Sequence, residues 1–398
     1  MSLSVRGVRL GVAQAGIKQA DHDDLVLIEL SPGSTNVGLF TQNAFRAAPV
    51  QLAQQHLKDN SGNARYWLIN TGNANAGTGL AGYKTAENTC LAVAEMQDCQ
   101  VTEVLPFSTG VIGEPLFAEL VINALPHACA DLDEIHWQRA SQAILTTDTH
   151  AKLASRVVSV SGSEVTLTGM AKGAGMIRPD MATMLAFVAT DAEISSVFLD
   201  RLFRQAVSAS FNRITVDGDT STNDAAMMAA TGCSGIAIEA EGAEAVAAFT
   251  QALESLCLEL AQAIIRDGEG ATKFVEVQVD GGADADECDA VAYTIAHSPL
   301  VKTALFASDP NWGRLLAAIG RAGLKNLCVE DVSLYLNDVL IAVNGARAPE
   351  YTEAQGQVAM APTELTIRID LKRGASSSRV WTTDFSYDYV RINAEYRT

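Results

Sequence analysis

The sequence predicts a fold that mixes α-helices and β-strands. Three observations indicate this class: short apolar runs of strand length, longer segments with helical periodicity between them, and no visible repeat or Pro/Ser/Gly-rich linker that would divide the chain. The chain has 398 residues, of which 48% are hydrophobic. It is therefore long enough to bury a large core, in two domains or in one layered domain.

Apolar runs predict the strands. In chain order they are DLVLIEL (24–30), RYWLIN (65–70), RVVSV (156–160), EVTLT (164–168) and ELTIRIDL (364–371). A further segment, MATMLAFVAT (181–190), is rich in residues that suit a buried strand. These runs recur along the whole chain, so we expect strands in both of its halves.

Helical patterns lie between these runs, at 84–97, 133–145 and 194–210. The clearest helix covers 243–267, because this segment is rich in Ala, Leu and Glu and contains neither Pro nor Gly. It ends at DGEG, where glycines supply the positive φ of a helix end. Glu269 is therefore expected in a turn just past a long helix.

Composition excludes several classes of function. The formal net charge is −19 and no run of Lys or Arg forms a basic stripe, so we expect no nucleic-acid partner and no membrane partner. The seven cysteines lie far apart without a CxxC pair, which favours reduced thiols over a disulfide framework or a zinc site. Neither a signal peptide nor a stretch of ~18 apolar residues is visible, so a cytoplasmic protein is expected.

Glycine-rich loops separate many of the predicted elements. They are NTGNANAGTG (70–79), STGVIG (108–113), GMAKGAG (169–175), DGDTSTND (217–224) and RDGEG (266–270). Such loops can bring backbone N–H groups against an anion, so a phosphate or nucleotide site is one interpretation. The spacing argues against it, because Lys172 precedes Gly173 instead of following a Walker glycine, and Arg178 stands where a dinucleotide motif needs glycine. DGDTSTND also lacks the EF-hand spacing, so no metal is expected there.

Thr183 lies at the head of the predicted strand 181–190, within KGAGMIRPDMATML (172–185). An ordinary threonine in this place would simply fit the pleat of the strand. Its neighbours favour a different interpretation, because Ala182 is small, Pro179 stiffens the approach and the preceding glycines let the backbone crowd close. These features predict a sharp, strained entrance to the strand.

Strain beside a hydroxyl favours self-cleavage through an N→O acyl shift. Thr183 Oγ1 would attack the carbonyl of Ala182, and water would cleave the ester into chains 1–182 and 183–398. The new α-amine of Thr183, with an ordinary pKa near ~7.7–8.0, is able to act as general base toward its own hydroxyl. No histidine is needed, and none of the six histidines lies in a GxSxG-type or HExxH setting.

With these motifs the sequence resembles the ornithine acetyltransferase family of arginine biosynthesis, also called glutamate N-acetyltransferases. The resemblance is most specific over residues 172–185 and covers nearly the whole chain. It includes the loops at 70–79 and 108–113, TTDT (146–149), NRITVDGDTSTND (212–224), RDGEGATKF (266–274), SDPNWGR (308–314) and INAEYRT (392–398). It implies a layered α/β/β/α sandwich of the self-processing, N-terminal-nucleophile-like type, in which the two chains share one core with a smaller C-terminal lobe.

The resemblance also implies the reaction and its residues. Acetyl would pass from N2-acetylornithine to Thr183 and then to glutamate in a ping-pong mechanism, with Thr109 and Gly110 as the oxyanion hole. The implied substrate contacts are Thr146 (with Thr147 as an alternate), Lys172, Thr183, Glu269, Asn393 and Thr398. Lys172 would suit either the substrate α-carboxylate or a developing negative charge, and Glu269 would suit a substrate ammonium.

No cofactor is implied, and the use of acetyl-CoA as a second acetyl donor is left open. The family pattern implies that the two cleaved chains stay associated as an α2β2 heterotetramer. One alternative is an amidase or aminopeptidase of related fold, because an N-terminal threonine beside an oxyanion hole also suits hydrolysis. The other alternative, a binding module without activity, leaves the strained entrance at Ala182 and Thr183 unexplained.

Overall fold

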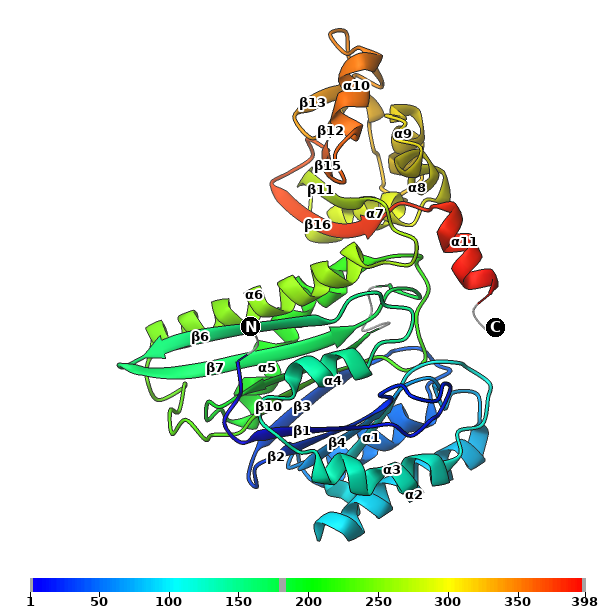
Figure 1. Ribbon diagram of the computed structural model, residues 1–398. Coiled ribbons are helices and arrows are strands. Elements are labelled where there is room, and N and C mark those ends of the chain that lie inside the picture. Colours follow the sequence, from blue (N-terminus) through cyan, green and yellow to red (C-terminus); the bar gives the residue numbers. More distant parts are fainter. Residues whose placement is uncertain (1–2, 179–183, 396–398) are drawn as a thin grey trace. The chain divides into compact units, whose positions relative to one another are not determined.

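The computed structural model describes residues 3–178 and 184–395, which fold into two compact units (Figure 1). Unit 1 comprises Met1–Asn212 and Asp219–Ile264, and unit 2 comprises Arg213–Gly218 and Ile265–Thr398. Both units contain helices and strands, which confirms the predicted mixed class.

Two sheets form the centre of unit 1. The four-stranded sheet has the order β1 (Val8–Ala13), β2 (Leu25–Leu30), β4 (Tyr66–Asn70), β5 (Val104–Ser108). The five-stranded sheet has the order β3 (Thr35–Phe40), β10 (Ala225–Ala230), β8 (Leu185–Thr190), β7 (Ser163–Lys172), β6 (Lys152–Val160). The pairs β4–β5 and β8–β10 are parallel and the other pairs are antiparallel.

The core of unit 1 explains why β2 is apolar at nearly every position. Val26 and Ile28 face the second sheet, in a core that includes Trp67, Phe187 and Met227. The alternate residues Leu25 and Leu27 face the helices on the other side. A strand that is buried on both faces reads as a continuous apolar run.

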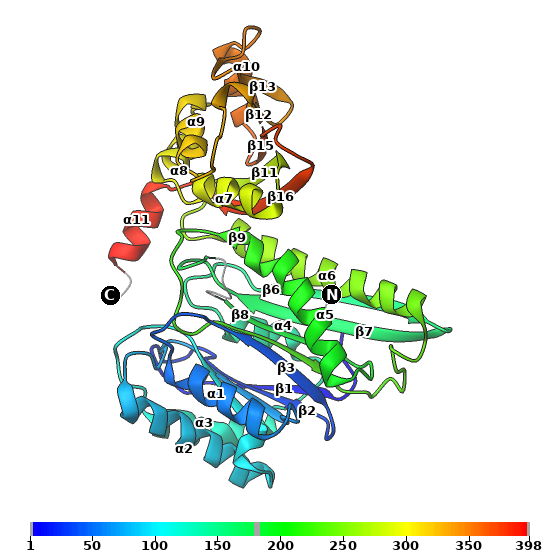
Figure 2. The ribbon, with the colours of Figure 1, turned by 180° about the vertical axis from the view of Figure 1, so that it is seen from behind.

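Helices cover the outer face of each sheet in unit 1 (Figures 1 and 2). α1 (Ala48–Asp59), α2 (Gly79–Gln97) and α3 (Ala118–Ala130) lie against the first sheet, while α5 (Ser196–Ala209) and α6 (Ala243–Arg266) lie against the second. The short helix α4 (Trp137–Ala143) contributes Trp137 to the core between the sheets. The order of layers is therefore α/β/β/α, as the resemblance implies.

Unit 2 contains a seven-stranded sheet. Its order is β14 (Ala346–Arg347), β13 (Val339–Val343), β12 (Ser333–Leu336), β15 (Glu364–Asp370), β11 (Phe274–Gly282), β16 (Ser376–Thr383), β9 (Ile214–Thr215). Its helices are α7 (Ala285–Ala296), α8 (Pro299–Phe306), α9 (Trp312–Gly320), α10 (Glu353–Met360) and α11 (Tyr387–Ala394). Residues of α7 to α10 pack with the sheet in one core. Short 3-10 helices lie at Val101–Glu103, Phe211–Arg213 and Val329–Asp331.

Most predicted elements are confirmed, with two differences at helix starts. The helix predicted at 84–97 begins earlier, at Gly79, and the one predicted at 133–145 is helical only over Trp137–Ala143. The second difference arises because Asp133 exchanges two backbone hydrogen bonds with Leu10 of β1 (2.9 and 3.1 Å), which holds it extended. The strand predicted at 181–190 corresponds to β8, which covers Leu185–Thr190, and residues 181–183 lie outside the described residues.

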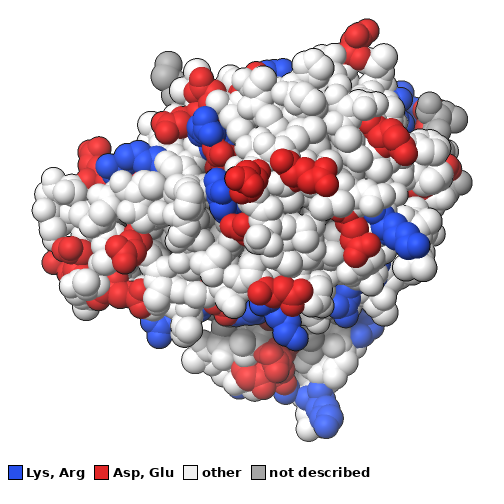
Figure 3. Space-filling model, turned by 90° about the horizontal axis from the view of Figure 1, so that it is seen from below, with Lys and Arg blue, Asp and Glu red and all other residues white. Residues whose placement is uncertain are grey.

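The state of the cysteines and the distribution of surface charge are relevant to the expectations from composition. All seven cysteines are unpaired. On the face of the molecule seen in Figure 3, acidic and basic side chains are scattered among uncharged ones. Within residues 3–178 and 184–395, no helix is both long enough and apolar enough to cross a membrane.

Candidate active site

The sequence-predicted site residues fall into two groups. Thr109, Gly110, Thr146 and Lys172 belong to unit 1, and Glu269 and Asn393 belong to unit 2. Ala182, Thr183 and Thr398 lie outside the described residues. Each group is brought together within its own unit from segments that are distant in the sequence.

The predicted oxyanion pair, Thr109 and Gly110, follows the end of β5 and lies against the loop after β4. Thr109 N donates to Asn70 O (3.0 Å), and Val111 N donates to Gly72 O (3.3 Å). Gly110 has a φ of +135°, and a Cβ on it would lie 2.2 Å from the carbonyl carbon of Gly72. Only glycine fits this combination of conformation and close approach.

Asn223, in the loop 217–224, fixes the position of the predicted oxyanion pair, and sequence reasoning missed this residue. The buried Asn223 donates its Nδ2 hydrogens to Ala74 O (2.6 Å) and Ser108 O (2.8 Å), so it ties the two glycine loops together. An asparagine in a polar loop gives no local signal of burial.

Lys172 is the last residue of β7 and is 7% exposed. Its Nζ donates to Thr146 Oγ1 (2.6 Å) and, over a longer distance, to Thr109 Oγ1 (3.4 Å). The sequence left open whether Thr146 or Thr147 belongs to the site, and it is the hydroxyl of Thr146 that contacts Lys172. Three of the four predicted residues of unit 1 are therefore joined through one ammonium group.

Asp148 is a further member of this cluster that sequence reasoning missed. Its side chain is fully buried, and its Oδ1 accepts hydrogen bonds from Lys152 Nζ (2.5 Å) and Gly173 N (2.6 Å). Its Oδ2 accepts from Thr146 N (3.2 Å) and lies 3.5 Å from Lys172 Nζ. Burial raises the pKa of Asp148, but the charges of Lys172 and Lys152 and these hydrogen bonds outweigh burial and hold that pKa well below its ordinary value.

In unit 2, Glu269 lies in the turn after α6, as predicted, and is 7% exposed. Asn393 of α11 donates its Nδ2 to Glu269 Oε2 (2.8 Å). Gly270 has a φ of +65°, and a Cβ on it would lie 2.4 Å from Tyr389 N. The turn and the C-terminal helix therefore pack backbone against backbone, and this contact brings Asn393 to Glu269.

The C-terminal segment is anchored to the same turn by polar side chains. Ser386 Oγ donates to Gly270 O (2.6 Å) and caps the first turn of α11. Asp384 accepts hydrogen bonds from Thr272 N (2.8 Å), Thr272 Oγ1 (2.5 Å) and Lys273 N (2.9 Å). These bonds hold residues 384–393 against residues 269–273.

Lys302 of α8 is fully buried behind this segment. Its Nζ donates to Thr382 Oγ1 (2.9 Å) and to the carbonyl of Thr383, and it lies 4.6 Å from the centre of the Phe385 ring. Burial lowers the pKa of Lys302 to about 7, against the opposing effect of the Asp384 and Asp217 carboxylates. A buried lysine of this kind was not predicted, because one lysine in an apolar helix gives no signal of its partners.

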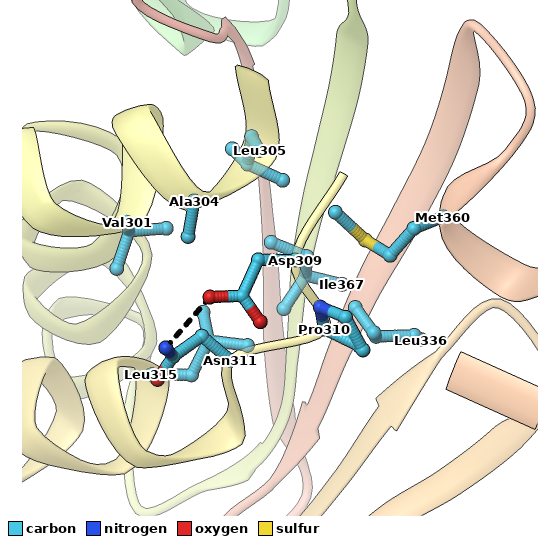
Figure 4. Close-up of a pocket in the computed structure, with 10 residues that line it drawn as sticks. All are labelled: Val301, Ala304, Leu305, Asp309, Pro310, Asn311, Leu315, Leu336, Met360 and Ile367. Atoms are coloured by element: carbon cyan, nitrogen blue, oxygen red, sulfur yellow. Dashed lines mark hydrogen bonds between the residues drawn. The ribbon is translucent and has the colours of Figure 1, made fainter. Parts of the chain in front are cut away.

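The segment SDPNWGR (308–314) borders a small apolar pocket in unit 2 (Figure 4). Asn311 Nδ2 donates to Asp309 Oδ2 (2.9 Å), and Asn311 Oδ1 accepts from Arg314 N (3.0 Å), so Asn311 caps α9. These contacts make the segment a capped turn at the start of α9. Among the residues that the structure describes, no group of three or more His, Cys, Asp or Glu side chains is placed to hold a metal ion.

Comparison with known proteins gives consistent matches. A sequence model of the ArgJ family matches residues 9–398. A relative from Pseudomonas fluorescens (strain Pf0-1), named arginine biosynthesis bifunctional protein ArgJ, is 54% identical over 396 residues, which cover 99% of this chain and 97% of the relative.

Two solved structures are also similar. The crystal structure of the arginine biosynthesis bifunctional protein ArgJ from Bacillus halodurans is 37% identical, with a TM-score of 0.49, and the match covers 52% of this chain and 97% of that chain. The ornithine acetyltransferase from Mycobacterium tuberculosis, complexed with ornithine, is 32% identical, with a TM-score of 0.39, and the match covers 44% of this chain and 92% of that chain.

Proposed function

The chain belongs to the ArgJ family, and we propose that this enzyme of arginine biosynthesis transfers acetyl from N2-acetylornithine to glutamate through Thr183. The observation that carries the proposal is the cluster of Lys172, Thr109 and Thr146 at the end of β7. In the sheet, Lys172 is the register partner of Leu185. Thr183 is two residues from Leu185, so this register supports a nucleophile close to the cluster.

The first step of the proposed mechanism is self-cleavage. Thr183 Oγ1 attacks the carbonyl carbon of Ala182, the peptide C–N bond breaks, and the released nitrogen becomes the α-amine of Thr183. Water then hydrolyses the Ala182 ester and regenerates the Thr183 hydroxyl. The products are the chains 1–182 and 183–398, the second beginning with its own nucleophile and its own general base.

Acetyl transfer then proceeds in two halves. The α-amine of Thr183 takes the hydroxyl proton as Oγ1 attacks the acetyl carbonyl of N2-acetylornithine, and ornithine leaves with that proton on its amine. The amine of glutamate next attacks acetyl-Thr183 and yields N-acetylglutamate. Both halves pass through a tetrahedral oxyanion, for which Thr109 Oγ1 and Gly110 N–H are the proposed donors.

Glu269 and Asn393 are the proposed amino-acid contacts in unit 2, together with Thr398. Glu269 is buried, and its carboxylate accepts a hydrogen bond from Asn393. A buried carboxylate is strongly stabilised by a cationic partner, so a substrate ammonium is a suitable ligand for Glu269.

The strand order supports lasting association of the two cleaved chains. In the order β3-β10-β8-β7-β6, the strands β10 and β8 belong to 183–398 and lie between β3 and β7 of 1–182. Separating the chains would open this sheet and its core on both sides. We propose that the two cleaved chains stay associated in the mature enzyme and, from the family resemblance, that two such pairs form an α2β2 heterotetramer in the cytoplasm.

The test combines mass spectrometry, N-terminal sequencing and activity. Active wild-type protein should consist of two chains, one of which begins with Thr183. The Thr183→Ala variant should remain a single 42.1 kDa chain without acetyl transfer, whereas Thr183→Ser should still cleave. Active material that contains only the uncleaved chain would contradict the proposal. Glutamate acetylation assayed with acetyl-CoA beside N2-acetylornithine determines whether the enzyme also uses the second donor.

A further inference from the structure

The cluster around Lys172 points to a positioning residue for the proposed reaction. Asp148 binds groups from the 146–148 turn, from β6 and from the segment after β7, through Thr146 N, Lys152 Nζ and Gly173 N. Its side chain is fully buried, and the side chain of Lys172 is 9% exposed. Water therefore screens the attraction between Asp148 and Lys172 only weakly.

The direction of the hydrogen bonds follows from the chemistry of lysine. A protonated lysine carries three N–H donors and no acceptor, so the hydroxyl oxygens of Thr146 and Thr109 accept from Lys172. The hydroxyl proton of Thr109 must then point away from Lys172. Because the backbone N–H of Thr109 already donates to Asn70 O, the hydroxyl is the group of Thr109 that is able to donate a hydrogen bond to an oxyanion.

We propose that Asp148 is the positioning residue that holds the Lys172 ammonium against Thr109, so that Lys172 orients and polarises the Thr109 hydroxyl as an oxyanion donor. This inference rests on the proposed acyl transfer and assigns Lys172 to the developing negative charge instead of the substrate carboxylate. A hydroxyl that accepts a charge-assisted hydrogen bond becomes a stronger donor through its own proton. Asp148 acts through Lys172 and does not touch the reacting atoms.

The kinetic consequence distinguishes positioning from substrate binding. An oxyanion contact forms only in the transition state, so its loss lowers kcat and leaves KM nearly unchanged. Loss of a contact to the substrate carboxylate would instead raise KM. The Asp148→Asn variant keeps the shape of the side chain and removes its charge.

The matched control is Asp191→Asn. Asp191 is also a buried carboxylate of unit 1, and it accepts from Thr166 N (2.8 Å) and pairs with Arg6 (2.7 Å). It follows the far end of β8 and takes no part in the proposed machinery. Both variants are compared with wild type for kcat and KM with N2-acetylornithine and glutamate, and for melting temperature.

We expect Asp148→Asn to lower kcat on the order of 100-fold with KM within about twofold, the scale seen when one oxyanion donor is lost. Asp191→Asn should keep the wild-type kcat even if its melting temperature falls. A wild-type kcat in Asp148→Asn, or a raised KM with unchanged kcat, would overturn the inference.

The Thr109→Val and Thr109→Ser pair decides the matter if Asp148→Asn does not fold. Thr109→Val should lose kcat on the same scale while Thr109→Ser retains it, and equal kcat values for the two would refute the role of the hydroxyl. If the wild-type enzyme transfers no acetyl group between the two amino acids, the proposed function is refuted but the inference about Asp148 is not. The variants are then compared on hydrolysis of p-nitrophenyl acetate, which passes through the same kind of oxyanion.

Discussion

Replacing Gly110 by alanine should damage both the stability of unit 1 and the proposed oxyanion hole. The new Cβ would lie 2.2 Å from Gly72 C, 2.5 Å from Asn73 N and 2.6 Å from Gly72 O, whereas real Cβ atoms essentially never approach closer than 3.0 Å. These neighbours are backbone atoms, and they lie in a loop held by hydrogen bonds from Thr109, Val111 and Ala74. The clash is therefore relieved only by moving the loops apart.

The magnitude has two parts. Alanine in this region of φ costs about 1–3 kcal/mol of strain, and an overpacked contact costs about 1–3 kcal/mol more. The free energy of unfolding should therefore fall by about 2–6 kcal/mol. Because the shift also displaces the N–H of Gly110, kcat should fall by about 100–1,000-fold, the effect of losing one oxyanion donor.

The control is Gly162→Ala, in the turn between β6 and β7. Gly162 also has a positive φ (+82°), but a Cβ there meets nothing within 4 Å. Strain alone should cost about 1–2 kcal/mol, with kcat unchanged. Urea unfolding followed by circular dichroism and steady-state kinetics measure the two effects. Equal losses of stability in both variants, together with a wild-type kcat for Gly110→Ala, would refute the reasoning.

Two further predictions concern unit 2. Because the pKa of Lys302 is lowered in the folded state, the unfolded state binds more protons between pH ~7 and ~10.5. The free energy of unfolding should therefore rise with pH by up to ~1.4 kcal/mol per pH unit in this range. The Lys302→Met variant should abolish this rise, as measured by urea unfolding. Gly270→Ala should push α11 away from the turn and break the Asn393–Glu269 contact, raising KM for the amino acids about tenfold (~1.4 kcal/mol) with little change in kcat.

Each of these predictions has its own control. For Lys302, the difference in unfolding free energy between wild type and Lys302→Met is compared at pH 7 and pH 8.5, and a difference that does not change with pH would contradict the lowered pKa. For Gly270, the control is Gly320→Ala at the end of α9, where a Cβ meets nothing within 4 Å. An unchanged KM in Gly270→Ala would show that the turn does not position the proposed amino-acid contacts.

The elements that the sequence predicted correctly are those that local composition determines. Apolar runs such as 24–30 and 364–371 become strands, and the segment 243–267 becomes α6 because it lacks Pro and Gly. The motif at 172–185 and the glycine loops were also visible in the sequence, together with the turn that holds Glu269. These signals arise from neighbours within a few residues, so no tertiary structure was needed to read them.

Only the tertiary structure showed which distant groups meet. No local pattern indicated that Asp148 and Lys152 are buried, because a charged side chain enters a dry interior only when a partner from another segment compensates it. Lys172 reaches Thr109 across 63 positions, and Asn393 reaches Glu269 across 124. Such contacts depend on strand register and on the packing of loops, which are properties of the whole unit, whereas propensity and periodicity act over a few residues.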